Sequence, residues 1–300
     1  MKKNALIKRY RVEDGTKFHL DDFDPGDTWK LKAKGHAQDW LEKGANRLCH
    51  LQSLLYAQNK WALLLIFQAM DAAGKDGTIK HVMSGVNPQG CQVFSFKVPS
   101  EEDLNHDFLW RSTKCLPERG RIGIFNRSYY EEVLVVRVHP KLLERQKLPD
   151  QLVTKDIWSN RFDDIKAFER YLSRNGVVIR KFFLHLSKKE QKGRLLSRLD
   201  EADKNWKFSM ADLEERKRWK DYMAAYDEMI QHTASEHAPW YVVPADHKWF
   251  TRLVVEEVIV ETLESLQLSY PKVDETKRKE LAEVRRALAG GITRPNRNKI

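Results

Sequence analysis

The stretch WALLLIFQAMDAAGKDGTIKHV, residues Trp61–Val82, decides the fold, because unbroken apolar residues run directly into two glycines that flank a lysine. Residues Trp61–Phe67 show no polar alternation, so the pattern predicts a strand buried on both faces, as in a parallel sheet covered by helices. A strand that leads into a glycine-rich turn and then a helix binds phosphate, since the helix N-terminus presents unpaired N–H groups and the positive end of its dipole. The stretch therefore raises the question of which anion Lys75 contacts.

The turn is a candidate phosphate-binding loop of the form GxxxxGK[ST], with two departures from that pattern. Ala69 occupies the first glycine position, and Asp76 replaces the serine or threonine that would ligate Mg²⁺. The glycines allow the backbone to approach a ligand closely, and Lys75 supplies a positive charge to phosphate oxygens. The alternative is an ordinary glycine-rich turn with a solvated lysine. The predicted phosphate-binding residues of the loop are Ala73, Gly74, Lys75, Asp76, Gly77 and Thr78.

A magnesium ion in this loop would need an oxygen ligand from a residue other than serine or threonine. Asp71 is the expected metal ligand, and Asp76 is a second candidate, because both can supply a carboxylate within the loop. The sequence leaves open whether Asp71 holds the metal or orients an acceptor phosphate. Mg²⁺ is the expected cofactor, with Mn²⁺ as the alternative.

A second polar cluster follows a strand-like run in IGIFNRSYYEEV. Asn126 stands where the Walker B carboxylate of a phosphate-binding domain would be, and it is a third candidate metal ligand or an orienting group for a metal-bound water. Arg127 follows at the expected carboxyl edge of the sheet, where an arginine points into the ligand crevice and pairs bidentately with phosphate. The alternative for Arg127 is a structural salt bridge at the strand end.

Strand-like and helical patterns alternate along the rest of the chain. Further strands are expected to start at Cys91, Arg121, Val177 and Trp240, and helical patterns cover residues 36–60, 101–116, 158–176, 210–233 and 252–266. This alternation predicts a three-layer α/β/α domain with a mainly parallel sheet of about five strands. The predicted boundaries are an irregular N-terminal arm over 1–34, the domain over 35–270 and a charged C-terminal tail over 271–300.

Composition restricts the class of partner. Lys and Arg number 53 against 43 Asp and Glu, and the resulting charge of +10 favours nucleic acid, a nucleotide, a phosphate polymer or an anionic membrane. The longest apolar run is far shorter than the roughly 20 residues of a membrane span, so no membrane partner is expected. Three scattered cysteines favour a reducing cytoplasm over a disulfide framework.

A basic segment with interleaved aromatic residues follows the fourth strand. In KNWKFS, Trp206 and Phe208 alternate with Lys204 and Lys207, which is typical of a lid that closes over an anionic ligand. We expect this lid to cover about residues 200–222. The basic residues over 216–220 alternate with glutamates, and the alternative for them is a solvated helix face.

Seven motifs in the same order resemble the polyphosphate kinase 2 family over about residues 35–268: DAAGKDG, NPQG, FLWR, FNRSYYEEV, KKEQKGRLLSRL, KNWKFSMADLEERKRW and APWYVV. Gly-Lys-Asp-Gly and Phe-Asn-Arg-Ser are similar to class III of that family, which phosphorylates both nucleoside mono- and diphosphates. The resemblance implies a P-loop kinase fold with a helical lid. It also implies reversible transfer of phosphoryl groups from inorganic polyphosphate to AMP and ADP, forming ADP and ATP, with GMP and GDP as further acceptors.

The resemblance also implies roles for individual residues. Asp71, Lys75 and Arg127 would be active-site residues, and Arg111 of FLWR would reach the phosphates. A polymer with one charge per phosphate needs a long basic path, for which the candidates are Lys80, Arg180, Lys181, Lys204 and Lys207. We expect a homo-oligomer, because the N-terminal arm and tryptophan-rich helices could support self-association.

Two other functions fit parts of the pattern. An ATP-dependent nucleotide or nucleoside kinase shares the loop and the basic lid and differs only in the phosphoryl donor. A nucleic-acid-binding protein fits the positive charge and the aromatic residues, although the acidic residues of the lid helix interrupt a continuous basic stripe, so we expect no nucleic-acid partner. A P-loop GTPase is disfavoured because the chain lacks an NKxD base-recognition motif.

Overall fold

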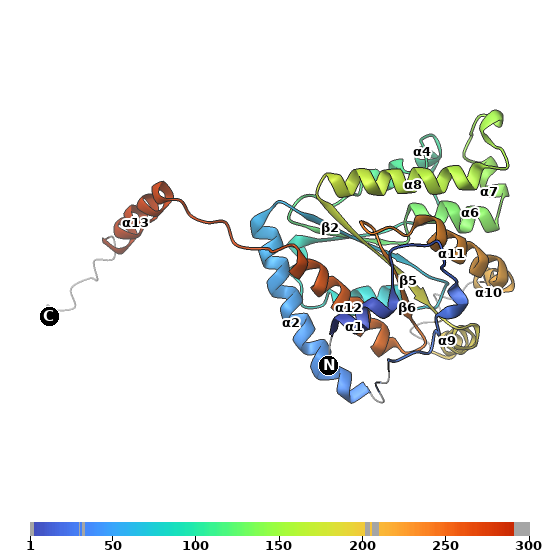
Figure 1. The fold of residues 1–300 in the computed structure, drawn as a ribbon, viewed down its shortest axis with the longest axis horizontal. Helices are drawn as coiled ribbons and strands as arrows, with labels where there is room; N and C mark the ends of the chain where they lie inside the picture. Colours follow the sequence, from blue (N-terminus) through green and yellow to red (C-terminus); the bar gives the residue numbers. More distant parts are fainter. Residues whose placement is uncertain (1–2, 30, 32–33, 202–204, 206–209, 291–300) are drawn as a thin grey trace, which may run out of the picture.

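The computed structural model describes residues 3–29, 31, 34–201, 205 and 210–290 (Figure 1). These residues form one six-stranded sheet with the order β1-β6-β5-β2-β4-β3, in which all neighbours are parallel except β1 and β6. The strands are β1 (Arg11–Val12), β2 (Ala62–Gln68), β3 (Cys91–Ser95), β4 (Ile122–Asn126), β5 (Val177–His185) and β6 (Trp240–Pro244). The predicted mainly parallel α/β/α fold is confirmed, with one additional strand that the N-terminal segment supplies.

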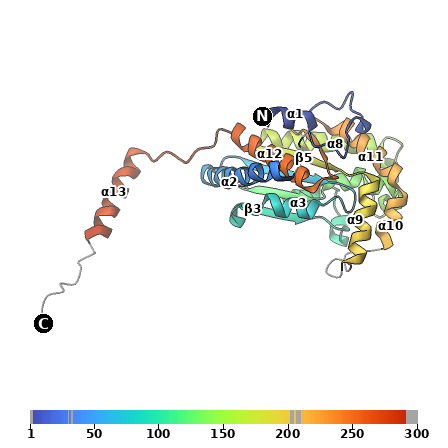
Figure 2. The ribbon, with the colours of Figure 1, turned by 90° about the horizontal axis from the view of Figure 1, so that it is seen from below.

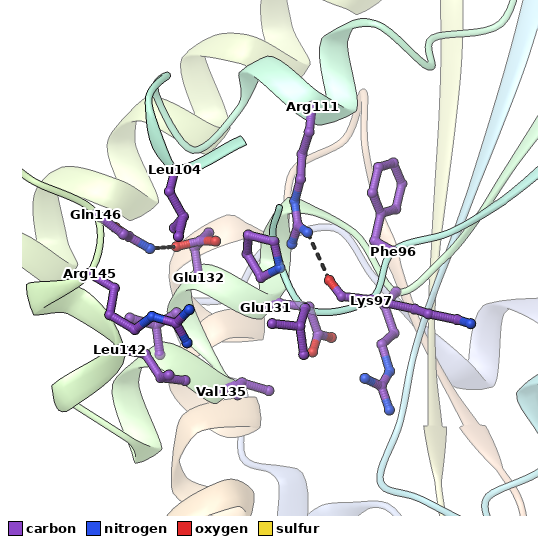
Figure 3. A pocket seen from close by; sticks show the side chains of 14 residues that line it. Phe96, Lys97, Leu104, Arg111, Glu131, Glu132, Val135, Leu142, Arg145 and Gln146 are labelled. Atoms are coloured by element: carbon purple, nitrogen blue, oxygen red, sulfur yellow. Dashed lines mark hydrogen bonds between the residues drawn. The ribbon is translucent and has the colours of Figure 1, made fainter. Parts of the chain in front are cut away.

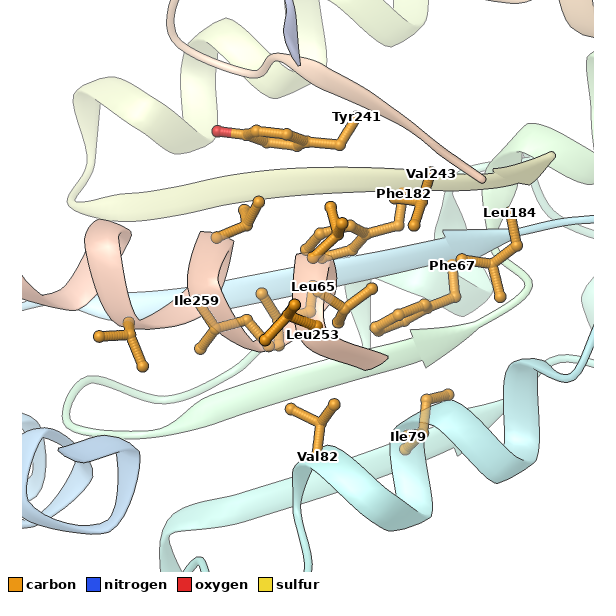
Figure 4. Close-up of a cluster of buried hydrophobic side chains, with 14 of the residues drawn as sticks. Leu65, Phe67, Ile79, Val82, Phe182, Leu184, Tyr241, Val243, Leu253 and Ile259 are labelled. Atoms are coloured by element: carbon orange, nitrogen blue, oxygen red, sulfur yellow. The ribbon is translucent and has the colours of Figure 1, made fainter. Parts of the chain in front are cut away.

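The central strand β2 is buried over its whole length, as the absence of polar alternation predicts. Leu65 and Phe67 point to one side of the sheet, where Phe67 stacks on Phe182 with ring centroids 4.9 Å apart (Figure 4). Leu64 and Ile66 point to the other side and join a second apolar cluster. Strand β2 therefore separates two hydrophobic cores, and its carboxyl end is paired with β4 on one side and β5 on the other.

Helices cover both faces of this sheet and complete the two cores (Figure 1). The first face carries α1 (Lys3–Tyr10), α2 (Lys34–Gln58), α3 (Lys75–Val82) and α12 (Lys248–Ser265). The second face carries α6 (Val135–Val138), α8 (Ile157–Arg174) and α11 (Trp219–Thr233). The remaining short or peripheral elements are η1 (Leu20–Asp22), η2 (Pro88–Gly90), α4 (Glu101–Leu104), α5 (Trp110–Thr113), η3 (Tyr129–Val133), α7 (Lys141–Glu144), η4 (Asp150–Leu152), α9 (Lys188–Asp200), α10 (Met210–Lys217) and α13 (Glu275–Gly290).

The N-terminal segment is more ordered than the predicted irregular arm. Leu6 and Ile7 of α1 are at most 1% exposed in the core, and Arg11–Val12 pair with β6 as an antiparallel edge strand. Burial of these apolar side chains stabilises a helix that its own short length would not. The segment is therefore part of the domain.

Two predicted helical patterns are divided in the structure, and the predicted charged tail contains a helix. Residues 101–116 form two short helices, and the first begins at a capping box between Ser100 and Asp103. The pattern over 210–233 divides at Arg218 into α10 and α11. The C-terminal α13 lies away from the rest of the chain in both views (Figures 1 and 2), and residues 291–300 of the predicted tail lie outside the described part. No helix within the described residues is both long and apolar enough to cross a membrane.

Lys181 and Arg180 correct the predicted polyphosphate path. Lys181 is fully buried, and its Nζ donates to Glu169 Oε2 at 2.6 Å, to the Thr233 carbonyl at 2.8 Å and to the Tyr130 hydroxyl at 3.0 Å. Arg180 Nε donates to Thr262 Oγ1 at 2.9 Å. Both residues lie in the middle of β5, where side chains face the covering helices and cannot reach a ligand at the strand ends.

Lys181 and Glu169 form a fully buried ion pair, so removal of either charge leaves the other without a partner. Burial lowers the pKa of Lys181, and the Glu169 carboxylate opposes that shift. We expect Glu169→Gln to reduce the free energy of unfolding by about 3–5 kcal/mol, because it leaves a buried ammonium without a counter-charge. Urea denaturation of this variant and of the double variant Glu169→Gln/Lys181→Met measures the effect. A double variant that is no more stable than Glu169→Gln alone would contradict this account.

Candidate active site

The loop between β2 and α3 is built for close approach of a ligand to its backbone. Gly74 has φ +97°, a left-handed conformation that favours glycine, and it caps α3 directly before Lys75. A Cβ at Gly77 would meet no atom within 4 Å, so the first turn of the helix borders open space. Ala72 also has a positive φ of +65°, which is uncommon for a residue with a side chain. The first amides of α3 therefore face a space that an anion can enter.

Lys75 lies beneath this loop with only 9% of its surface exposed. Its Nζ donates to the Ala69 carbonyl at 2.7 Å, so the lysine folds back along the loop. Burial lowers the pKa of Lys75, while the nearby Asp71 carboxylate opposes the shift. The ammonium is thus held in a place where hydration is poor and an incoming phosphate would compensate its charge.

Arg127 directly follows β4 and reaches the same loop, as the sequence predicts. Its guanidinium forms a salt bridge with Asp71 Oδ1 at 3.1 Å, and its backbone N–H donates to the Phe67 carbonyl at 3.1 Å. The residue has φ +65°, a strained conformation that commonly marks functional sites. Burial alone would lower the pKa of Arg127, but the carboxylates of Glu131 and Asp71 outweigh it, and the net shift is upward.

Asn126 and Asp76 meet each other across the mouth of the loop. Asn126 Nδ2 donates to Asp76 Oδ1 at 2.7 Å, so the amide of β4 fixes the first turn of α3. The two oxygen-bearing side chains and Asp71 border one cavity, which brings together all three candidate metal ligands. No group of three or more His, Cys, Asp or Glu side chains suited to a metal occurs in the described ranges. This small set of oxygen donors fits Mg²⁺, which proteins often bind through one or two carboxylates and substrate phosphates.

The cavity above the loop has a volume of about 740 Å³. It contains nine of the predicted site residues, namely Asp71, Ala73, Gly74, Lys75, Asp76, Gly77, Thr78, Asn126 and Arg127. Lys80 is exposed on α3 and does not line it. Lys204 and Lys207 lie outside the described residues, together with most of the predicted lid segment KNWKFS.

Four cationic residues that sequence reasoning missed complete this cavity: Lys97, Arg198, Lys248 and Arg252. Lys248 and Arg252 are four residues apart at the start of α12, directly after the carboxyl end of β6. The sequence did contain a signal for these two residues. Two basic residues four apart share one face of a helix, and a helix that follows a parallel strand begins at the ligand edge of the sheet. With Lys75 and Arg127, the described lining holds six cationic side chains against three carboxylates, so the cavity favours a polyanion.

A second cavity has a volume of about 220 Å³ (Figure 3). It adjoins the first, because Phe96, Lys97 and Arg127 line both. Its lining is largely apolar and includes Val98, Pro99, Leu104, Val135, Val136 and Leu142. Arg111, a predicted phosphate contact, lies at this cavity, where Nη1 donates to the Lys97 carbonyl at 2.8 Å and the guanidinium covers the Phe96 ring. Burial raises the pKa of Glu131 at the same wall, while Arg127 and Lys75 oppose that shift.

Comparison with known proteins places this geometry in a family. Residues 31–271 match the family model described as Polyphosphate kinase 2. The ADP-polyphosphate phosphotransferase of Rhodopseudomonas palustris is 55% identical over 282 residues, which cover 94% of this chain and 98% of that protein. The AMP/ADP-polyphosphate phosphotransferase of Meiothermus ruber is 45% identical, with 92% of this chain and 100% of that protein covered.

A solved structure supports the same relationship. The crystal structure of Polyphosphate Kinase 2 from Arthrobacter aurescens TC1 superposes with a TM-score of 0.85 at 40% sequence identity, and the match covers 93% of this chain and 96% of that one. The family match includes the phosphate-binding loop, Arg127 and both cavities. The chain belongs to the polyphosphate kinase 2 family.

Proposed function

We propose that the protein transfers a phosphoryl group from inorganic polyphosphate to AMP and ADP, forming ADP and ATP, with GMP and GDP as further acceptors. The observation that carries this proposal is that a large cationic cavity and a smaller apolar cavity meet at Arg127. A polymer of phosphates suits the first cavity, because its charge is neutralised along its length. A nucleoside suits the second, because aromatic bases bind in largely apolar pockets with a few polar groups.

The transfer step takes place where the two cavities meet. An oxygen of the acceptor phosphate attacks the terminal phosphorus of the polymer, the bridging P–O bond breaks, and its electron pair leaves on the shortened polymer. Phosphoryl transfer requires in-line placement and charge neutralisation more than covalent chemistry from the protein. Lys75 and the loop amides hold the donor phosphates, and Arg127 contacts the transferred group with its two-pronged guanidinium.

Asp71 has two roles in this proposal. Its carboxylate positions Arg127 through the 3.1 Å salt bridge, and together with Asp76 and Asn126 it would supply the oxygen donors that hold Mg²⁺, or Mn²⁺ as an alternative. Bound Mg²⁺ would neutralise negative charge that develops on the phosphate oxygens. Arg111 remains a predicted phosphate contact, now on the acceptor side.

The decisive experiment offers polyphosphate as the sole phosphoryl donor. We expect purified protein with Mg²⁺ to form ADP from AMP and ATP from ADP, measured by chromatography of the nucleotides, and to lose this activity when EDTA removes the metal. A reaction with ATP as donor and a nucleoside or AMP as acceptor is the control. Turnover with ATP but none with polyphosphate would assign the protein to the ATP-dependent kinases and refute the proposal.

The expectations on self-association and nucleic-acid binding can be tested in the same preparation. A cytoplasmic location stays a prediction, which the three free thiols in the structure support. Self-association stays a prediction, and light scattering coupled to size-exclusion chromatography measures it. Absence of nucleic-acid binding also stays a prediction, which salt-dependent titration with oligonucleotides tests.

A further inference from the structure

Three consecutive carbonyls of the phosphate-binding loop are tied to one helix behind it. Gln191 Nε2 donates to the Asp71 carbonyl at 3.0 Å, and Arg194 Nη1 donates to the carbonyls of Ala72 at 3.2 Å and Ala73 at 2.9 Å. Gln191 is 1% and Arg194 9% exposed, and neither lines either of the two cavities. Helix α9 therefore holds these carbonyls on the side of the loop that faces away from the ligand space.

Arg194 also fixes a second segment that borders the large cavity. Its Nη2 donates to the carbonyls of Ala245 at 2.6 Å and Asp246 at 3.0 Å, in the connection from β6 to α12. Its Nε donates to Glu190 Oε1 at 2.9 Å, which keeps the guanidinium in one orientation. Helix α12 begins two residues after Asp246 and carries Lys248 and Arg252. One buried guanidinium thus joins the two backbone segments that lead into Lys75 and into Lys248 and Arg252, which are three of the six cationic side chains that line the cavity.

The direction of the loop carbonyls matters for anion binding. A carbonyl oxygen that faced the cavity would repel phosphate, whereas successive N–H groups that face it form an anion-binding concavity. The required backbone is strained, since Ala72 has φ +65°, and such a conformation persists only when surrounding contacts over-determine it. The donors on Gln191 and Arg194 provide those contacts.

The same helix connects the loop to α10, which lies within the predicted lid range of about residues 200–222. Arg216 Nη1 of α10 donates to Gln191 Oε1 at 2.7 Å and to the Lys188 carbonyl at 2.8 Å. The Gln191 amide therefore contacts α10 with its oxygen and the loop with its nitrogen.

We propose that Arg194 and Gln191 are positioning residues, which hold the loop carbonyls away from the polyphosphate and keep the loop amides turned toward it. The inference rests on the proposed function in one respect, namely that the bound anion is polyphosphate. It predicts a loss of polyphosphate binding in variants of two residues that touch no substrate.

The test compares Arg194→Met with Arg119→Met. Arg119 is a matched control because it also bridges two carbonyls, those of Lys60 and Asn175, but at the opposite end of the sheet. We expect Arg194→Met to raise the Kd of tripolyphosphate, measured by calorimetry, and the KM of polyphosphate by at least about tenfold, and to lower kcat about 10- to 100-fold. The KM of AMP should not change, and Arg194→Lys should recover part of the loss. Arg119→Met should bind tripolyphosphate as the wild type does.

Gln191→Met keeps the test decisive if Arg194→Met does not fold. It removes one hydrogen bond to the loop and should weaken tripolyphosphate binding in the same direction by a smaller factor. Wild-type affinity for tripolyphosphate in folded Gln191→Met and Arg194→Met would overturn the inference. Failure of the wild-type protein itself to use polyphosphate would instead refute the proposed function, so the two results are distinguishable.

Discussion

Lys75→Met is expected to lower the rate of phosphoryl transfer by on the order of 10³, which corresponds to about 4 kcal/mol of transition-state stabilisation. The reason is that Lys75 supplies a preorganised positive charge at the loop, in a place where only 9% of the side chain is exposed. Electrostatic interactions are stronger there than in bulk water, and the ammonium needs no reorganisation during the reaction. Single-turnover and steady-state assays with polyphosphate and ADP measure the effect.

The same substitution should leave the fold intact or stabilise it. Burial lowers the pKa of Lys75, which means that the charged lysine is less favourable in the folded protein than in water and reduces the free energy of unfolding. Methionine fills a similar volume and removes that cost, so the thermal midpoint should not fall. Lys60→Met, at the opposite end of β2, is the control for the loss of a lysine and should keep full activity. Equal turnover in Lys75→Met and Lys60→Met would remove Lys75 from the mechanism.

Arg127→Met is expected to reduce kcat by on the order of 10³ as well, and unlike Lys75→Met it should weaken both substrates. Arg127 lines the large cavity and the small one, so its guanidinium can contact donor and acceptor phosphates at the place where they meet. We therefore expect the KM of polyphosphate and the KM of AMP to rise together. Initial rates over a matrix of both substrate concentrations separate these two effects.

Arg127→Lys distinguishes geometry from charge. Lysine keeps one positive charge but presents a point charge in place of a planar fork, so it cannot pair bidentately with phosphate. We expect it to recover only part of the activity. Arg121→Met is the matched control, because Arg121 precedes β4 as Arg127 follows it. A wild-type kcat in Arg127→Lys would show that catalysis does not require bidentate pairing of the guanidinium with phosphate.

The predicted site residues that the structure brings together at the large cavity are those whose position depends on local chain geometry. Lys75 and Gly74 follow a continuous apolar strand and open a helix, and the pattern of a few adjacent residues is enough to predict that arrangement. Arg127 was predictable for a related reason. Parallel strands place their carboxyl ends along one edge of the sheet. A residue directly after β4 therefore lies near the loop that follows the neighbouring strand β2.

The residues placed wrongly or missed depend on what packs against each strand. Arg180 and Lys181 read as a basic pair on a strand, but β5 lies inside the sheet with a helix layer on each face. Lys181 therefore needed a buried partner, which Glu169 supplies from α8. A sequence does not say which acidic residue lies opposite a given lysine, because that contact joins segments far apart in the chain.

What the sequence by itself determined is the glycine-rich turn between β2 and α3, the mainly parallel sheet and the family, because each follows from contiguous residue patterns. What only the tertiary structure decided is the second cavity, the cations of α12 and the hydrogen bonds from Arg194 to carbonyls in two separate segments, at Ala72 and Ala73 and at Ala245 and Asp246. The physical reason is that hydrogen bonds and charges act over a few ångströms in space. Which residues come within that distance depends on how segments far apart in the chain pack together.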